Sequence, residues 1–151
     1  MALQFVTKES LSRFNETTGN VPPTTDGTQA SLLLLPYDIG FIAGFNGTYV
    51  AEAVAVKTYG QMVMCRLGTF VGITGWLDSP PLGNTIIDIE KNGTSIFTTK
   101  PQFTQTVALT GGTLSSTPTF APNDRITFKV TQIGSTAQPG TGMRVILKCK
   151  V

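Results

Sequence analysis

The feature that most constrains this fold is the turn pair Asn92-Gly93, which lies between two strand-like segments. A type I′ turn requires positive φ at both central residues, and an Asn-Gly pair adopts that geometry readily. Apolar residues flank the turn at Ile87 and Ile89 before it and at Ile96 after it. The segment therefore predicts an antiparallel β-hairpin in which the turn fixes the register.

Composition favours strands in the rest of the chain. Only 13% of the 151 residues are charged, and 16 residues are glycine and 9 are proline. Such a composition disfavours long helices and is typical of strands joined by turns. A chain of this length forms one ordinary domain with a core of its own.

Further strand patterns recur along the chain, in residues 49–57, 61–71, 103–109, 125–133 and 143–151. The alternation of apolar and polar residues is cleanest in the last two, and in the last one only Ile146 departs from it. Strands at this spacing with turn residues between them predict an all-β protein, an antiparallel β-sandwich or a jelly-roll-like fold.

Two of these segments carry more specific expectations. The alternation of small residues and valines in residues 49–57 predicts a strand that is buried on both faces. Gly68 and Gly72 interrupt the segment 61–71 and predict a bulge or a close neighbour. After Phe120, the residues Ala121 to Asp124 predict a turn, in which Asn123 tolerates the left-handed conformation.

The first 31 residues differ from the rest of the chain. They are rich in threonine, glycine, proline and asparagine, and their apolar side chains are few. Such a segment buries too little surface to offset its ordering entropy alone, so residues 1–31 are predicted to be an extended N-terminal arm. The folded domain is predicted to span residues 32–151.

Charge and hydropathy exclude several classes of partner. The net charge is +2, and no block of like charges is present that would follow a phosphate backbone, so nucleic acid is not expected as a partner. No apolar run is long enough to cross a membrane, and the first residues lack a signal-peptide pattern. We expect a protein that is made in the cytosol.

The sequence offers little for catalysis. It contains no histidine, which removes the commonest general base and metal ligand, and no zinc or calcium motif is present, so neither a metal nor a cofactor is expected. Asp88 and Glu90 alternate on one strand face and form the only candidate carboxylate pair; a solvated face is the alternative that we favour. Asp124 and the other turn aspartates are expected to cap backbone amides. We expect a protein that is not an enzyme.

Cysteines and aromatic residues give weaker indications. Cys65 and Cys149 lie in apolar stretches and are expected to be unpaired core residues, with a disulfide between neighbouring strands as the alternative. Trp76 is the only tryptophan. It and Tyr59 are candidates for a partner or glycan contact, although aromatic residues of a sandwich more often belong to the core.

Two groups of motifs resemble a known family. The run Leu35-Pro36-Tyr37-Asp38-Ile39-Gly40-Phe41 is followed later by Asp88-Ile89-Glu90-Lys91-Asn92-Gly93-Thr94-Ser95-Ile96 and by Phe120-Ala121-Pro122-Asn123-Asp124-Arg125. Together they resemble a β-sandwich domain found in virion structural proteins of tailed bacteriophages. The motifs are turns and strand edges, so the resemblance implies a fold and a virion context and carries over no catalytic residue. Asn123 stands where that family usually has glycine.

The resemblance implies a virion protein without enzymatic activity. The expected role is a capsid decoration or cement protein that binds the major capsid protein, or other virion proteins, and stabilises the head. A homo-oligomer remains open, and the alternative role is a tail-fibre or baseplate module that binds a host receptor or glycan. The arm is expected to contact the capsid through its apolar residues, which are Leu3, Phe5, Val6, Leu11 and Phe14.

Overall fold

The computed structural model describes residues 20–23, 29–31, 36–116 and 118–151. Within these ranges the chain forms β-strands and no helix, so nothing in the described residues is a helix long and apolar enough to cross a membrane. The strands are β1 (Asn20–Pro23), β2 (Gln29–Ser31), β3 (Ile39–Ala43), β4 (Lys57–Val63), β5 (Gly68–Trp76), β6 (Asn84–Lys91), β7 (Thr94–Ser95), β8 (Phe97–Thr99), β9 (Gln102–Thr104), β10 (Thr113–Leu114), β11 (Thr119–Phe120), β12 (Arg125–Gln132) and β13 (Met143–Lys150).

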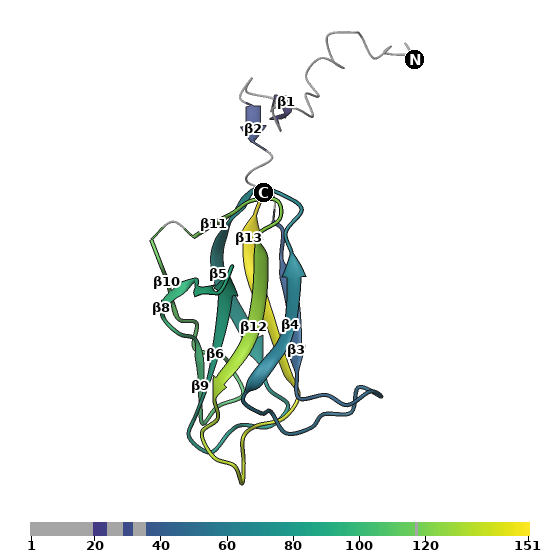
Figure 1. Ribbon diagram of the computed structural model, residues 1–151, viewed down its shortest axis with the longest axis vertical. Coiled ribbons are helices and arrows are strands. Elements are labelled where there is room, and N and C mark those ends of the chain that lie inside the picture. The colour runs from purple at the N-terminus through teal and green to yellow at the C-terminus, as the bar shows by residue number, and fades with distance from the viewer. Residues whose placement is uncertain (1–19, 24–28, 32–35, 117) are drawn as a thin grey trace, which may run out of the picture.

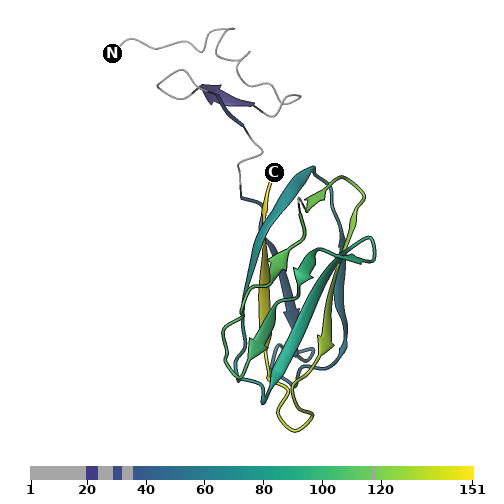
Figure 2. The ribbon, with the colours of Figure 1, turned by 90° about the vertical axis from the view of Figure 1, so that its left-hand side faces the viewer.

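From β3 onward, all strands except β8 and β10 form two antiparallel sheets that pack face to face (Figures 1 and 2), and β8 and β10 form a separate two-stranded sheet. The β13 sheet has the order β11-β5-β13-β3, and the β12 sheet has the order β4-β12-β6-β7, with β9 also paired to β6. Counted from β3, with β8 and β10 left out and β7 and β9 taken as one interrupted strand, the two sheets contain eight strands. The first, eighth, third and sixth of these form the β13 sheet. The second, seventh, fourth and fifth form the other. This is the order of a jelly roll, and the all-β antiparallel prediction is confirmed.

The hairpin predicted at Asn92-Gly93 is present between β6 and β7. Both turn residues have positive φ, 52° and 87°, as a type I′ turn requires. Lys91 pairs with Thr94 directly beyond the turn. Only the two residues of β7 continue this pairing, because β8 then leaves β6 and pairs with β10 instead.

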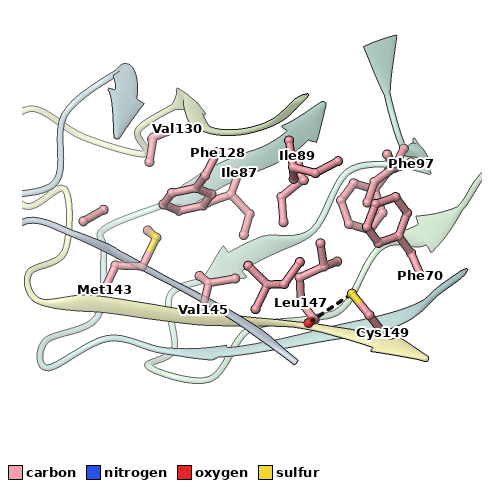
Figure 3. Packing of buried hydrophobic residues seen from close by; sticks show 14 of the residues in the cluster. Phe70, Ile87, Ile89, Phe97, Phe128, Val130, Met143, Val145, Leu147 and Cys149 are labelled. Carbon is pink, nitrogen blue, oxygen red and sulfur yellow. Dashed lines mark hydrogen bonds between the residues drawn. The ribbon is translucent and has the colours of Figure 1, made fainter. Parts of the chain in front are cut away.

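The core lies between the sheets and comes mainly from their central strands (Figure 3). Phe128 of β12 and Leu147 of β13 are fully buried, and the ring of Phe128 stacks on Phe41 with centroids 5.2 Å apart. The alternation predicted for β13 is confirmed, including the exposed position of Ile146, which is 37% accessible. β12 follows its predicted alternation except at Thr127, which is buried on the polar face.

The strand predicted for residues 49–57 is wrong. Lys57 begins β4, and residues 49–56 form a loop that crosses the end of the sandwich, where Glu52 N donates to Gly44 O (2.7 Å) and Val54 N donates to Gly140 O (2.9 Å). The backbone groups of this loop are therefore hydrogen-bonded although the loop belongs to neither sheet. Val54 is buried, but Val50 and Val56 are exposed, so the predicted burial on both faces is wrong as well.

The single strand predicted for residues 61–71 is two strands, β4 and β5, with a turn between them. Met64 N donates to Asp124 O (2.8 Å), which ties this turn to the turn before β12. The predicted bulge is confirmed at Val71, which has no partner on β13. The predicted close neighbour is confirmed at Gly68, where a Cβ would lie 2.4 Å from Lys150 O.

Two further predictions have different outcomes. The strand predicted for residues 103–109 is only partly present, because β9 ends at Thr104 and Gln105 takes a φ of 54°. The turn before β12 is confirmed, with Asn123 at a φ of 74°.

Strands β1 and β2 pair with each other. The five apolar residues named above for the arm lie outside the described residues.

Candidate binding surface

Asp88 and Glu90 share one face of β6, as predicted, but the favoured expectation of a solvated face is wrong for Asp88, which is buried; each carboxylate belongs to a separate ion pair. Asp88 is 2% exposed, accepts a hydrogen bond from Ser95 Oγ (2.7 Å) and lies 2.8 Å from Lys100 Nζ. Glu90 pairs with Lys129 on the neighbouring strand β12. Both carboxylates are therefore engaged by cations rather than by each other.

A hollow of about 310 Å³ lies on this outer face of the β12 sheet. Its lining is polar and consists of Thr58, Gln61, Glu90, Asn92, Gly93, Arg125, Thr127 and Lys129. Gln61 Nε2 donates to Thr127 Oγ1 (2.9 Å), so much of the lining is bonded within the protein. Among the described residues no group of three His, Cys, Asp or Glu side chains lies close enough to hold a metal ion.

The opposite outer face, on the β13 sheet, is more apolar. We call it the Trp76 face and define it by four exposed apolar residues, which are Ile42, Val71, Trp76 and Ile146, at 50%, 45%, 53% and 37% accessibility. They come from three neighbouring strands, since β13 pairs with β3 on one side and β5 on the other. An exposed apolar area of this kind on a sheet is a candidate contact surface.

Two glycines, Gly40 and Gly72, contribute backbone without a side chain to the Trp76 face. Ile146 lies over Gly40, because its Cδ1 is 3.6 Å from the position that a Cβ on Gly40 would take. No atom lies within 4 Å of the corresponding position on Gly72. Lys148 and Lys150 are exposed on the same face of β13, so the surface combines apolar and positively charged groups.

Charged groups surround Trp76. Arg144 is opposite Trp76 in the β5–β13 pairing and opposite Ile42 in the β3–β13 pairing. Its Nη1 donates to Asp78 Oδ1 (2.6 Å), and its guanidinium carbon lies 4.7 Å from the ring centre of Phe45. The ion pair and the cation–π contact hold Arg144 beside the exposed indole.

Tyr59, the other aromatic candidate, lies in the β12 sheet, so the structure does not bring it together with Trp76. Its ring packs against Phe128 with centroids 6.3 Å apart, and Lys57 Nζ lies 4.7 Å from its ring centre. The hydroxyl accepts a hydrogen bond from Ala55 N (2.7 Å). These contacts leave Tyr59 half-buried rather than presented to a partner.

A second hollow, of about 180 Å³, lies where the β13 sheet ends near the chain terminus. Leu67, Gly68, Thr69, Thr119 and Lys150 line it. Leu67 is 60% exposed, so this hollow adds apolar surface to the same side of the molecule. Leu67 is its only aliphatic residue, but the surface exposed inside it is mainly apolar, in contrast to the hollow on the other sheet.

The two cysteines have different environments, and both are free. Cys149 is buried, and desolvation, followed by the nearby Asp38 charge, raises the pKa of its thiol to about 12. Cys65 is exposed, so its predicted core position is wrong; it lies in the turn between β4 and β5. Its Sγ is 3.7 Å from the hydroxyl of Tyr37, and this hydrogen bond is the main cause that raises the pKa of Tyr37.

Asn92 and Asp124 connect two turns at one end of the sandwich. Asn92 Nδ2 donates to Asp124 Oδ1 (2.7 Å), and Asn92 Oδ1 accepts from Arg125 N (2.8 Å). Ala121 N donates to Asp124 Oδ2 (2.9 Å), which confirms the predicted capping role. That backbone bond, followed by the bond from Asn92, holds the pKa of Asp124 below its usual value.

The fold and the surface together define a jelly-roll protein with an exposed apolar face on one of its two sheets. No family model matches the chain. No curated protein matches it either.

Sequence reasoning named Trp76 but missed its neighbours Ile42 and Ile146. The signal for Ile146 was present, because it is the one apolar residue on the polar side of β13. Ile42 gave no such signal, since it lies in an apolar run without regular alternation. Tyr49 lies in the segment that was predicted as a strand and that the structure shows to be a loop.

Proposed function

We propose that this protein is a non-enzymatic structural protein of a tailed-phage virion that decorates the head and stabilises it across capsid subunits. The observation that carries the proposal is the Trp76 face. Its residues are exposed and do not belong to the hydrophobic core between the two sheets. Exposed apolar surface interspersed with positively charged groups suits contact with another protein. The jelly roll, an architecture of viral capsid proteins, and the sequence resemblance support the virion context.

The proposed attachment has two parts. The Trp76 face packs on the capsid surface, and its lysines Lys148 and Lys150 favour an acidic partner surface. The arm of residues 1–31 orders on neighbouring subunits and adds contact area. Several symmetric copies multiply individually weak contacts into a stable coat.

A second candidate function rests on the surroundings of Trp76. An exposed indole beside the Arg144–Asp78 pair combines a stacking surface with hydrogen-bonding groups, which suits a sugar ring. This would fit a tail-fibre or baseplate module that binds a host glycan. Specific binding on a glycan array that is lost in Trp76→Ala, with folding intact, would favour this function over decoration.

The principal experiment titrates the protein onto purified phage heads that lack it. Ile42→Asp places a charge on the Trp76 face, and Val63→Asp is the matched control, because Val63 is 57% exposed on the edge strand of the other sheet. We expect Ile42→Asp to weaken head binding at least ~10-fold, since the contact loses an apolar side chain and must desolvate a carboxylate, and the neighbouring Arg144 already pairs with Asp78. Val63→Asp should bind like the wild type. Equal binding by both variants would reject the Trp76 face as the capsid contact.

The arm is tested separately with a chain that lacks residues 1–31. We expect it to lose stable attachment to heads while its thermal unfolding remains cooperative. A shortened chain that still saturates the heads would contradict the role of the arm and leave the Trp76 face as the main contact.

A further inference from the structure

The loop after β3 contains a short hairpin, which we call the finger and define as residues 45–51. Phe45 and Ala51 form a bridge, Tyr49 N donates to Asn46 O (3.0 Å), and Asn46 N donates to Val50 O (3.1 Å). This is a type I turn followed by one residue in the left-handed conformation. Figure 1 shows the loop extending sideways from the end of the sandwich opposite the C-terminus.

Tyr49 occupies the left-handed position, with a φ of 59°. Glycine or asparagine is the usual residue there, and a bulky side chain is strained. The ring of Tyr49 is 76% exposed, so packing within the domain does not compensate for this strain. A strained and exposed aromatic residue points to a role outside the folded domain.

The finger is held in one conformation. Asn46 Oδ1 accepts hydrogen bonds from Thr48 N (3.0 Å), Thr48 Oγ1 (2.8 Å) and Val50 N (3.0 Å). At its base, Phe45 lies beneath the Arg144 guanidinium. Tyr49 is thus presented at little further entropic cost, which is a property of aromatic anchors in interfaces.

The polar side chains of the finger favour a protein partner over a sugar. Asn46 and Thr48 bond to each other and to the finger backbone, so they are engaged within the hairpin rather than turned toward hydroxyl groups of a ligand. The finger presents Tyr49 and Val50, which are 76% and 59% exposed, and no charged side chain lies within residues 45–51. Apolar and aromatic groups of this kind match the desolvated centre of a protein interface.

The hollow near the C-terminus lies at the other end of the domain and is large enough for one aromatic ring. Its volume is about 180 Å³. A cavity of about 150 Å³ suffices for a benzene ring. Two cations lie at the hollow, because Lys150 lines it and Arg66 is exposed in the adjoining turn. Glu52 lies beside the finger, is exposed and belongs to none of the ion pairs of the described residues. Arg144 at the base of the finger is paired with Asp78, so Glu52 is the unpaired charge that we identify beside the finger, and Lys150 and Arg66 are those beside the hollow.

We propose that the finger of one copy of this chain docks into the hollow of a second copy, with Tyr49 against Leu67 and with Glu52 facing Lys150. One molecule cannot make this contact with itself, because the two elements lie at opposite ends of the sandwich. The interaction is therefore self-association, and it does not depend on the identity of any capsid partner.

Sedimentation velocity of the full chain across a range of concentrations tests the proposal. We expect species larger than the 16.1 kDa monomer. Tyr49→Gly should weaken association at least ~30-fold, as loss of a central aromatic anchor does, while thermal unfolding is unchanged or shifted upward because the strain is removed. Val56→Ala, at a similarly exposed position of the same loop, is the control and should associate like the wild type. A protein that stays monomeric, or Tyr49→Gly that associates normally, would overturn the proposal.

Charge reversal gives a second test that is independent of strain. Glu52→Lys and Lys150→Glu should each associate poorly, since each places like charges across the contact. An equimolar mixture should recover association, because each finger then meets a hollow of opposite charge. If the mixture stays monomeric although the wild type associates, the finger and the hollow are not partners and the proposal fails. Association that persists undiminished in both single variants would overturn it in the same way.

Discussion

The pair Asn92 and Asp124 offers a test in which two residues exchange their chemistry. Asn92→Asp alone replaces a donating amide with a carboxylate that faces Asp124 Oδ1, where the present distance is 2.7 Å. Asp124→Asn in the same chain supplies a new donor. The introduced amide can donate to the introduced carboxylate while its oxygen still accepts from Ala121 N. Every hydrogen bond of the original pair is thereby restored in reverse.

The expected magnitudes follow from the contacts. A hydrogen bond to a charged group contributes about 1.5 to 3 kcal/mol, and two carboxylates in contact at a solvated site repel by about 1.5 kcal/mol in water. Because Asn92 is exposed, we take the lower ends and expect Asn92→Asp to destabilise the domain by about 3 kcal/mol. For a domain of this size, this lowers the unfolding midpoint by roughly 10 °C. The double variant should lie within about 1 kcal/mol of the wild type, because its bonds are complete.

The assay is urea unfolding of the wild type, both single variants and the double variant at neutral pH, followed by tryptophan fluorescence. The coupling free energy between the two substitutions should be at least about 2 kcal/mol in the stabilising direction. The loss in Asn92→Asp should also shrink at acidic pH, where the carboxyl groups become protonated. Additive effects of the two substitutions would show that the two turns are not joined by this pair, and the reasoning would be refuted.

Three further predictions concern titration and packing. Because the folded pKa of Asp124 is depressed, its contribution to stability is present above pH ~4 and lost as the pH falls through the folded value; Asp124→Ala should flatten this acid dependence in urea titrations. The raised pKa of Cys149, about 12, predicts that the stability of the domain falls as the pH rises above ~9. It also predicts that a maleimide labels only Cys65 in the folded protein, and rapid labelling of both thiols would contradict this. Phe128→Ala should lower the unfolding free energy by about 3 to 5 kcal/mol, whereas Val71→Ala on the exposed bulge should change it by under about 0.5 kcal/mol. Similar losses in the two variants would mean that Phe128 is not at the centre of the core.

The sequence predicted best those elements whose structure is determined locally. The Asn92-Gly93 turn and the alternation in β12 and β13 depend on backbone preference and on one buried face, and both are confirmed except at Thr127 of β12. The segment 49–57 failed because alternation of small residues and valines has the same pattern in a strand and in a loop that bonds across the end of a sandwich. Only its distant partners, such as Gly140, distinguish the two.

The Trp76 face could be predicted only in part for a similar reason. Whether an apolar side chain is buried depends on which sheet face it occupies and what covers that face, and neither is local information. Ile146 showed its exposure by breaking a regular alternation, whereas Ile42 had no pattern to break. The finger could not be predicted, because the left-handed backbone of Tyr49 results from a hairpin whose sequence lacks the expected glycine at that position.

The alternation of consecutive strands between the two sheets has a consequence for how the chain folds. Strand β13 lies between β3 and β5, so the centre of its sheet stays open until residues 143–150 are in place. Few pairings join neighbours in the sequence, and loop-closure entropy makes such distant pairings slow to form. Until β13 inserts, the facing edges of β3 and β5 are unpaired and exposed to other chains. Folding of this domain is therefore expected to be slow and to depend on its last strand, and incomplete chains are expected to aggregate.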